Sequence, residues 1–308
     1  MYSGIHMRVE QGKEWIAYND DCVNVLKQLP TDSIHLTITS VPFASLYTYS
    51  DDERDFSNVK DLEEFFNQMD YLVPELYRVT APGRIIALHC KQIPTFKGRD
   101  GKMGLIDFRG MLIKVFEKHQ WTYHGEITVW TDPQIEATRT KAASILHNSF
   151  KKFAEITRTG MADYVVLMQK TEREDEWVHV THENTDENFK HWTQLASPCW
   201  GFNSDANPRI QRTNVLNAQL AKEDKDEKHM TPLQLDLIEE LIYWYTNECE
   251  VVCDPFGGVL SVGYKAIQMN RKAILCELKE SYFNTGTKFM KDLELEMSQP
   301  TLFDEESI

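Results

Sequence analysis

Short apolar runs recur along the chain, and segments with helical spacing separate them. Seven runs have the length and the β-branched or alternating content that is typical of strands. These are Glu14–Asn19, Ile34–Thr39, Arg84–His89, Glu126–Trp130, Asp163–Met168, Glu250–Asp254 and Lys272–Glu277. Five intervening segments place apolar residues on one helical face. These are Asp61–Tyr77, Phe108–Lys118, Leu233–Tyr245, Val262–Met269 and Lys279–Glu296. Strands that alternate with helices predict an α/β fold with a mostly parallel sheet.

Two regions interrupt this alternation. The segment Lys91–Gly104 is rich in glycine and lysine, which predicts a mobile loop. The segment Thr171–His229 has little periodicity and contains scattered aromatic residues, among them Trp177, Phe189, Trp192 and Trp200. It is expected to be an inserted subdomain, whose tryptophans either build a small local core or contact bases.

Composition narrows the class of protein. The 308 residues suit one large or two ordinary domains, and no apolar run approaches the 18 residues of a membrane span. The N-terminus lacks an apolar signal core, so a cytoplasmic protein without a membrane partner is expected. Six cysteines without a C-x-x-C pair favour free thiols over disulfides, and no metal site is expected.

Charge is unevenly distributed. The net charge is −15, but residues 78–158 carry 14 Lys and Arg against 7 Asp and Glu, whereas the remainder carries 19 against 41. The basic segment is either a solvated helix face or a patch that binds phosphates within an otherwise acidic surface.

Two stretches at the ends of predicted strands contain residues that could bind a ligand. The first, TSVPFASLYTYS (residues 39–50), places aromatic residues at a strand end, and ligands bind at the carboxyl ends of strands in open α/β sheets. The second, residues 251–277, has the strand, glycine turn, helix and strand order of a nucleotide-binding unit. Its turn carries Asp254 and lacks G-x-G-x-x-G, which favours a ligand with positive charge over a pyrophosphate.

Three motifs together resemble a known family. DPFGG, HMTPLQLDLIEELI and YNDDCVNVLKQLPTDSIHLTITSVPF are similar to the motifs of beta-class DNA amino-methyltransferases, of phage or prophage type. The resemblance spans roughly residues 17–290, with the catalytic motif before the cofactor motif. It implies a Rossmann-like S-adenosylmethionine-dependent methyltransferase sheet in circularly permuted order, with an inserted target-recognition region. The expected units are 14–171 (catalytic half), 172–228 (recognition insert), 229–297 (cofactor-binding half) and 298–308 (flexible tail).

The resemblance also implies roles at the catalytic motif. The Ser40 side chain and the Val41 carbonyl would accept hydrogen bonds from the exocyclic amine of the base. Pro42 would stiffen the turn, and Phe43 would stack on the flipped base. Because Val41 acts through its backbone, Val41→Pro is expected to leave methylation nearly intact.

Cofactor and DNA contacts follow from the same resemblance. Residues expected to bind S-adenosylmethionine are Asp21, Thr231, Asp254, Pro255, Phe256, Gly257, Gly258 and Glu277. Cations expected to contact the phosphates of double-stranded DNA are Lys91, Lys97, Arg99, Lys102, Arg139, Lys141, Lys151, Lys152 and Arg158. Leu260 stands where the family has a second glycine, which puts cofactor binding in question and leaves an inactive DNA-binding relative as an alternative.

The identity of the substrate remains open in part. Ser40 favours cytosine N4 over adenine N6, because Ser-Pro-Pro motifs in the family are associated with cytosine. A methyltransferase that acts on RNA or on an Asn or Gln side chain of a protein is a further alternative. The tail Gln299–Phe303 resembles a peptide that docks to the replication sliding clamp, and the family is compatible with a homodimer.

Overall fold

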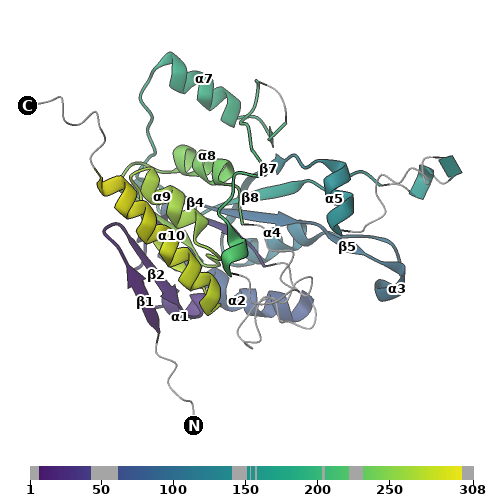
Figure 1. Ribbon diagram of the computed structural model, residues 1–308, viewed down its shortest axis with the longest axis horizontal. Coiled ribbons are helices and arrows are strands. Elements are labelled where there is room, and N and C mark those ends of the chain that lie inside the picture. Colours follow the sequence, from purple (N-terminus) through teal and green to yellow (C-terminus); the bar gives the residue numbers. More distant parts are fainter. Residues whose placement is uncertain are drawn as a thin grey trace, which may run out of the picture.

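Nine strands of the described residues form one sheet, the middle layer of the computed structural model (Figure 1). The structure describes residues 7–42, 62–140, 151–152, 154–156, 158–202, 205–221 and 232–299. In spatial order the strands are β1 (Arg8–Gln11), β2 (Trp15–Asn19), β11 (Lys272–Cys276), β10 (Val251–Asp254), β3 (Ile34–Ser40), β4 (Thr80–Lys91), β8 (Asp163–Gln169), β7 (Thr122–Val129) and β9 (Cys199–Trp200).

The middle of this sheet is parallel. Strands β2, β11, β10, β3 and β4 pair in parallel, so their carboxyl ends meet at one edge. Strand β1 is antiparallel to β2, and β8 is antiparallel to both β4 and β7. Strand β9 then adds in parallel to β7. The predicted, mostly parallel α/β sheet is confirmed.

Helices cover both faces of the sheet and create two cores. On one face lie α1 (Cys22–Leu26), α2 (Leu62–Val79) and α4 (Phe108–Lys118), and on the other α8 (Leu235–Tyr245), α9 (Ser261–Gln268) and α10 (Glu280–Ser298). Strand β4 shows why both faces are covered: Ile85 and Ala87 join the α8–α9–α10 core, and Ile86 and Leu88 join the α1–α2–α4 core. A parallel sheet between two layers of helices is a three-layer, Rossmann-like fold.

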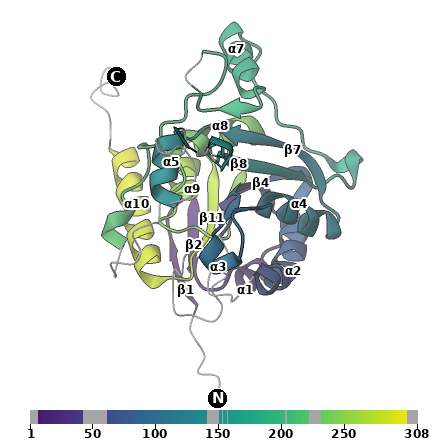
Figure 2. The same ribbon diagram turned by 90° about the vertical axis from the view of Figure 1, so that its right-hand side faces the viewer.

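The predicted loop at Lys91–Gly104 is wrong. Strands β5 (Ile93–Thr95) and β6 (Gly104–Ile106) pair as an antiparallel hairpin that carries the single-turn helix α3 (Lys97–Asp100). Ile93 is buried in the α1–α2–α4 core, which anchors the hairpin to the sheet. Figure 1 shows α3 projecting from the body on the side where β4 ends, and this side faces the viewer in Figure 2.

One of the two alternatives for the tryptophans of Thr171–His229, a small local core, does not hold for Trp200. Strand β9 belongs to the main sheet, and Trp200 is fully buried in the α8–α9–α10 core. Helix α7 (Asp186–Leu195) instead projects from the layers, with Phe189 and Trp192 exposed (Figure 1). The segment therefore contributes Trp200 to the main core, whereas most of helix α7 lies outside that core.

The remaining short elements connect these layers. They are helix α5 (Pro133–Thr140) and the 3-10 turns η1 (Ala154–Ile156), η2 (Glu174–Glu176) and η3 (Ala218–Ala221). Among the helices of the described ranges, none combines the length and apolar character needed to cross a bilayer.

Candidate active site

The order of strands reverses between β3 and β10, which are neighbours in the sheet although the chain leaves them in opposite directions. Such switch points place a crevice at the carboxyl ends of the strands. Ser40 ends β3 and Asp254 ends β10, so the two motifs singled out in the sequence lie side by side. A hydrogen bond links the two motifs, since the Thr39 hydroxyl donates to Asp254 Oδ1 over 2.8 Å.

Asp254 is the most strongly perturbed acid at this edge. Its side chain is buried, and burial raises the pKa of Asp254 to about 7. The Thr39 hydroxyl and the Phe256 amide, 3.0 Å away, favour the ionised form and oppose part of that rise. The carboxyl group can therefore change its charge near neutral pH in response to a bound cation.

The turn after Asp254 is built on two glycines. The Gly257 amide donates to the Cys276 carbonyl over 2.7 Å, and the Gly258 amide donates to Glu277 Oε2 over 2.7 Å. Gly258 has φ of +53°, and a Cβ built there would meet no atom within 4 Å. An open backbone of this kind lets a ligand approach closely.

Glu277 and Asp21 stand on the next two strand ends. Glu277 also accepts the Lys279 amide at Oε1, over 2.7 Å, and a carboxylate has further lone pairs for ligand hydroxyls. Asp21 caps α1 by accepting the Val23 amide over 2.7 Å, so part of its carboxylate has a structural role. With Asp254, these acids form a row that suits a cationic ligand rather than a phosphate.

Leu260, the departure from the family's glycine, keeps the backbone that a glycine would adopt. Its φ is +62° and ψ is +33°, in the left-handed region, directly before α9. The side chain is fully buried, and a Cβ on Gly286 of α10 would lie 2.5 Å from Leu260 Cγ. Leucine therefore fills the core beneath the turn, where Gly286 makes room for it.

The catalytic motif contains a contact that the sequence did not predict. Ser40 Oγ lies 3.0 Å from Nδ1 of His89, which is its directly paired neighbour on β4. The buried Val41 donates its amide to the His89 carbonyl over 3.1 Å. A proline at position 41 has no amide hydrogen and would lose this bond. The expectation that Val41→Pro leaves methylation nearly intact did not include the resulting loss of about 1 kcal/mol in folding stability.

Two of the predicted phosphate-binding cations are held by the protein. Lys91 Nζ lies 2.5 Å from Asp163 Oδ1, and both side chains are largely buried. Arg158 is half-buried, donates to the Thr159 carbonyl over 3.1 Å and lies 3.8 Å from the buried Glu136. Sequence counting of charges did not reveal these partners, which compete with a phosphate for both cations.

Other predicted cations are exposed. Lys97 and Lys102 lie on the β5–α3–β6 hairpin beside the carboxyl edge, and Lys151 and Lys152 are also exposed. Arg99 lies in α3 and Arg139 in α5, although their side chains are outside the described part.

Several predicted site residues fall outside the described ranges. They are Phe43, Lys141, Thr231 and, in the tail, Pro300–Phe303. Of the other predicted residues, Pro42 follows Val41 at the edge, and Pro255 and Phe256 follow Asp254 in the turn. The described residues contain no group of three or more His, Cys, Asp or Glu arranged to hold a metal.

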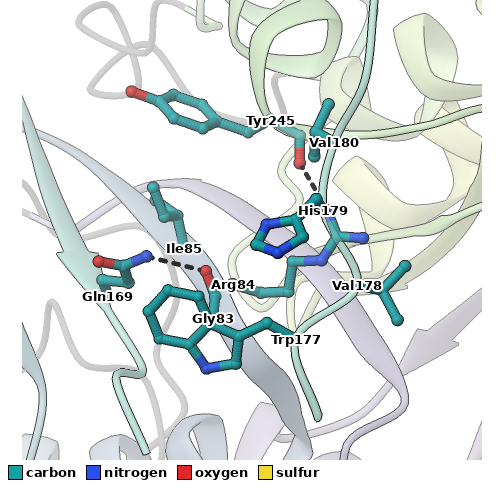
Figure 3. Close-up of a pocket in the computed structure, with 9 residues that line it drawn as sticks. All are labelled: Gly83, Arg84, Ile85, Gln169, Trp177, Val178, His179, Val180 and Tyr245. Atoms are coloured by element: carbon teal, nitrogen blue, oxygen red, sulfur yellow. Dashed lines mark hydrogen bonds between the residues drawn. The ribbon is translucent and has the colours of Figure 1, made fainter. Parts of the chain in front are cut away.

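A separate pocket of about 140 Å³ lies at the opposite, amino edge of the parallel strands. Arg84 near the start of β4, Trp177 and His179 line it, and Figure 3 shows them around the opening. Arg84 is buried and paired with Glu250, and the Trp177 ring packs on Gly83. The pocket is therefore remote from Ser40 and Asp254, and its guanidinium already has a carboxylate partner.

Comparison with known proteins places this geometry in context. The family model described as DNA methylase matches residues 34–288. The type II methyltransferase M.BglII of Bacillus subtilis is 23% identical over 273 residues, which cover 89% of this chain and 68% of that protein.

Solved structures share the fold. The PvuII DNA methyltransferase, cytosine-N4-specific, superposes with a TM-score of 0.63 at 17% identity, covering 93% of each chain. A putative DNA modification methylase of Thermus thermophilus, solved with S-adenosyl-L-methionine, gives a TM-score of 0.61 at 17% identity, covering 92% of this chain and 95% of that one.

Proposed function

The chain belongs to the DNA methylase family, and from this membership we propose that it transfers a methyl group from S-adenosylmethionine to an exocyclic amine of a base in double-stranded DNA. The observation that carries the proposal is the Thr39–Asp254 bond, which fixes the catalytic strand end beside the acidic glycine turn. An amine acceptor and a site for a sulfonium cation thus share one edge.

The residues at this edge suit methyl transfer, which needs alignment more than a strong base. The Ser40 hydroxyl oxygen and the Val41 carbonyl accept the two hydrogens of the amine and direct its lone pair. Pro42 keeps the turn rigid, and Phe43 is assigned to the face of the flipped base. The cofactor supplies an electrophilic methyl group on sulfur.

The cofactor site is assigned to the acidic row. Glu277 and the open backbone at Gly258, with the adjoining Gly257, suit the ribose, and Asp254 suits positive charge on the methionine part. Asp21 is assigned to the adenine side and Thr231 to the methionine end, with Pro255 and Phe256 shaping the turn. The retained left-handed backbone at Leu260 argues against the inactive alternative.

DNA is assigned to the carboxyl edge. The exposed Lys97, Lys102, Lys151 and Lys152 would bind phosphates, and the same role is assigned to Arg99, Arg139 and Lys141. Lys91 and Arg158 are left out of this set because both are held internally. The segment 172–228, with the exposed aromatic residues of α7, is assigned to target recognition between the halves 14–171 and 229–297.

Cytosine N4 is the preferred target. Ser40 supports it through the association of serine with N4 methylation, and the fold neighbour named cytosine-N4-specific is consistent with it. Adenine N6 is the alternative.

One assay tests the function and the base together. Purified protein is incubated with tritiated S-adenosylmethionine and unmethylated plasmid or phage DNA, and the labelled nucleosides are separated. We expect label in N4-methylcytosine, whereas N6-methyladenine would replace the base assignment. Absence of label from every DNA, with label in RNA or protein instead, would overturn the DNA proposal.

Two partners remain predictions. Docking of Gln299–Phe303 to a sliding clamp is tested by deleting these residues, and unchanged clamp binding by the truncated chain would exclude it. A homodimer is tested by sedimentation of the purified protein.

A further inference from the structure

Ser40 is the first of four polar side chains that run across one face of the sheet. His89 and Lys91 on β4 and Asp163 on β8 follow it, and all four share a face with residues of the α8–α9–α10 core, because along their strands they alternate with residues of the α1–α2–α4 core. Resting on the proposed function, we propose that His89 is a positioning residue that orients the Ser40 hydroxyl as an acceptor and takes up, through it, the proton released by the methylated amine.

The tautomer of His89 decides how Ser40 is oriented. His89 Nε2 is buried, and within the described part of the chain it has no hydrogen-bond partner. Asp163 Oδ2 lies 3.6 Å from Nε2, which is too long for a direct hydrogen bond, but its negative charge favours a proton on Nε2. Nδ1 is then the acceptor that faces Ser40 Oγ at 3.0 Å.

A hydroxyl has one hydrogen to donate and two lone pairs. When Ser40 donates its hydrogen to His89, both lone pairs remain for the amine hydrogens of the base. Serine then offers the amine an acceptor like the oxygen of Asp or Asn. Without His89 the hydroxyl could rotate and donate toward the amine nitrogen, where it would occupy the lone pair needed for attack.

Ser40 and His89 provide a complete path for the proton that the amine loses. The amine lone pair forms the new N–C bond as the S–C bond of the sulfonium breaks, and the sulfur retains that electron pair. The amine nitrogen then loses one proton to Ser40 Oγ, while the Ser40 hydrogen moves to His89 Nδ1. The resulting imidazolium faces the Asp163 carboxylate and later releases its proton to water.

Asp163 is ionised when the His89 imidazolium forms. Burial alone would raise the pKa of Asp163, but His89 and Lys91 outweigh burial and hold it well below its usual range. Asp163 of β8 faces His89 and also pairs with Lys91 of the His89 strand, and Ser40 faces His89 from β3. The nearby acid Glu136 of α5 is engaged with Arg158 and the Met161 amide instead.

Single-turnover methylation at saturating S-adenosylmethionine and DNA, followed from pH 5 to 9, tests the inference. We expect the wild-type rate to fall toward acid through one ionisation, because the protonated imidazole cannot accept from Ser40. His89→Asn, which can accept a hydrogen bond but no proton, should lose that ionisation and about 100-fold in rate. Asp163→Asn should move the ionisation to lower pH, because the imidazolium loses its stabilising carboxylate.

His119 provides the matched control. Its Nε2 lies 2.8 Å from Asp70 Oδ1, at the opposite edge of the sheet, and His119→Asn should keep the wild-type rate and pH profile. Wild-type methylation with unchanged rate and profile in both His89→Asn and Asp163→Asn would overturn the inference. If His89→Asn folds poorly in thermal unfolding, the Asp163→Asn shift decides alone. Failure of the wild type to methylate any DNA would instead refute the proposed function.

Discussion

At the scale of single residues, Asp254 links burial to ligand charge. Burial raises the pKa of the Asp254 carboxyl to about 7, and a neighbouring cation favours its ionised form. Binding of S-adenosylmethionine should therefore release a proton when it takes place below that pH.

We expect cofactor affinity to weaken as the pH falls from 8 to 5.5, because the protonated Asp254 must ionise first. Titration calorimetry at several pH values measures this change. Asp254→Asn should bind more weakly at pH 8 and show a flatter dependence on pH. An equally steep dependence in Asp254→Asn would assign the ionisation to another group.

The contribution of Asp254 to folding stability depends on pH in the opposite direction from its contribution to cofactor binding. Between the unfolded pKa near 3.8 and the folded value of about 7, the folded state holds a proton that the unfolded chain has lost. Asp254 thus makes its most favourable contribution to folding below the unfolded pKa and loses it as the pH rises through about 7. The carboxylate form, which the proposed cofactor site would use, therefore gives the less stable fold.

Leu260 offers a second test at this scale. Removing its buried side chain should cost about 2–5 kcal/mol in the free energy of unfolding. A glycine also relieves the left-handed backbone, worth about 1 kcal/mol, whereas alanine does not. Urea unfolding should therefore rank Leu260→Gly above Leu260→Ala in stability, the reverse of the order at ordinary helical positions.

Residue roles were only partly predictable from the sequence. Ser40, Asp254 and Glu277 were identifiable as candidates because each stands at or just after the end of an apolar strand within a motif. The contact between His89 and Ser40 was not predicted, because it depends on the pairing register of two strands whose contacting residues are 49 positions apart. A histidine that ends an otherwise apolar strand was the available signal.

At the scale of elements, the β5–α3–β6 hairpin carries exposed lysines beside the proposed DNA site. The sequence concealed this hairpin because its strands have three residues each, too short for a periodic pattern. The longer elements were recognisable because their apolar spacing extends over several turns or pleats, as in α2 and β4.

We expect Lys97→Ala combined with Lys102→Ala to weaken DNA binding and to reduce the slope of log affinity against log salt by about 1.8, or 0.9 per phosphate contact. Fluorescence anisotropy with a labelled duplex at several salt concentrations measures both quantities. Lys27→Ala, an exposed lysine after α1, is the control and should change neither. An unchanged slope in the double variant would remove the hairpin from the DNA surface.

At the scale of the whole molecule, the segment 172–228 is not separable from the sheet. Trp200 is fully buried, stacks near Trp244 at 6.1 Å between ring centres, and donates its indole N–H to the Leu195 carbonyl. Scattered aromatics gave no sequence signal for this, because one buried residue in a two-residue strand has no period.

Trp200→Ala should therefore lower the free energy of unfolding by about 3–5 kcal/mol. Trp192→Ala, on the exposed side of α7, should change it by about 0.5 kcal/mol or less. Chemical denaturation of the two variants compares them directly. Equal effects would mean that residues 172–228 fold around their own core.

The Thr39–Asp254 bond also has a consequence for synthesis. Its partners are 215 residues apart, so β3 leaves the ribosome long before β10 exists to pair with it. At about 5–20 residues per second, that interval is about ten to forty seconds. The nascent chain must then carry the open edge of an apolar strand, a surface on which other chains can aggregate. The same junction that unites the two motifs in the finished protein can form only when most of the chain has been made, and β11 then closes the sheet between β10 and β2.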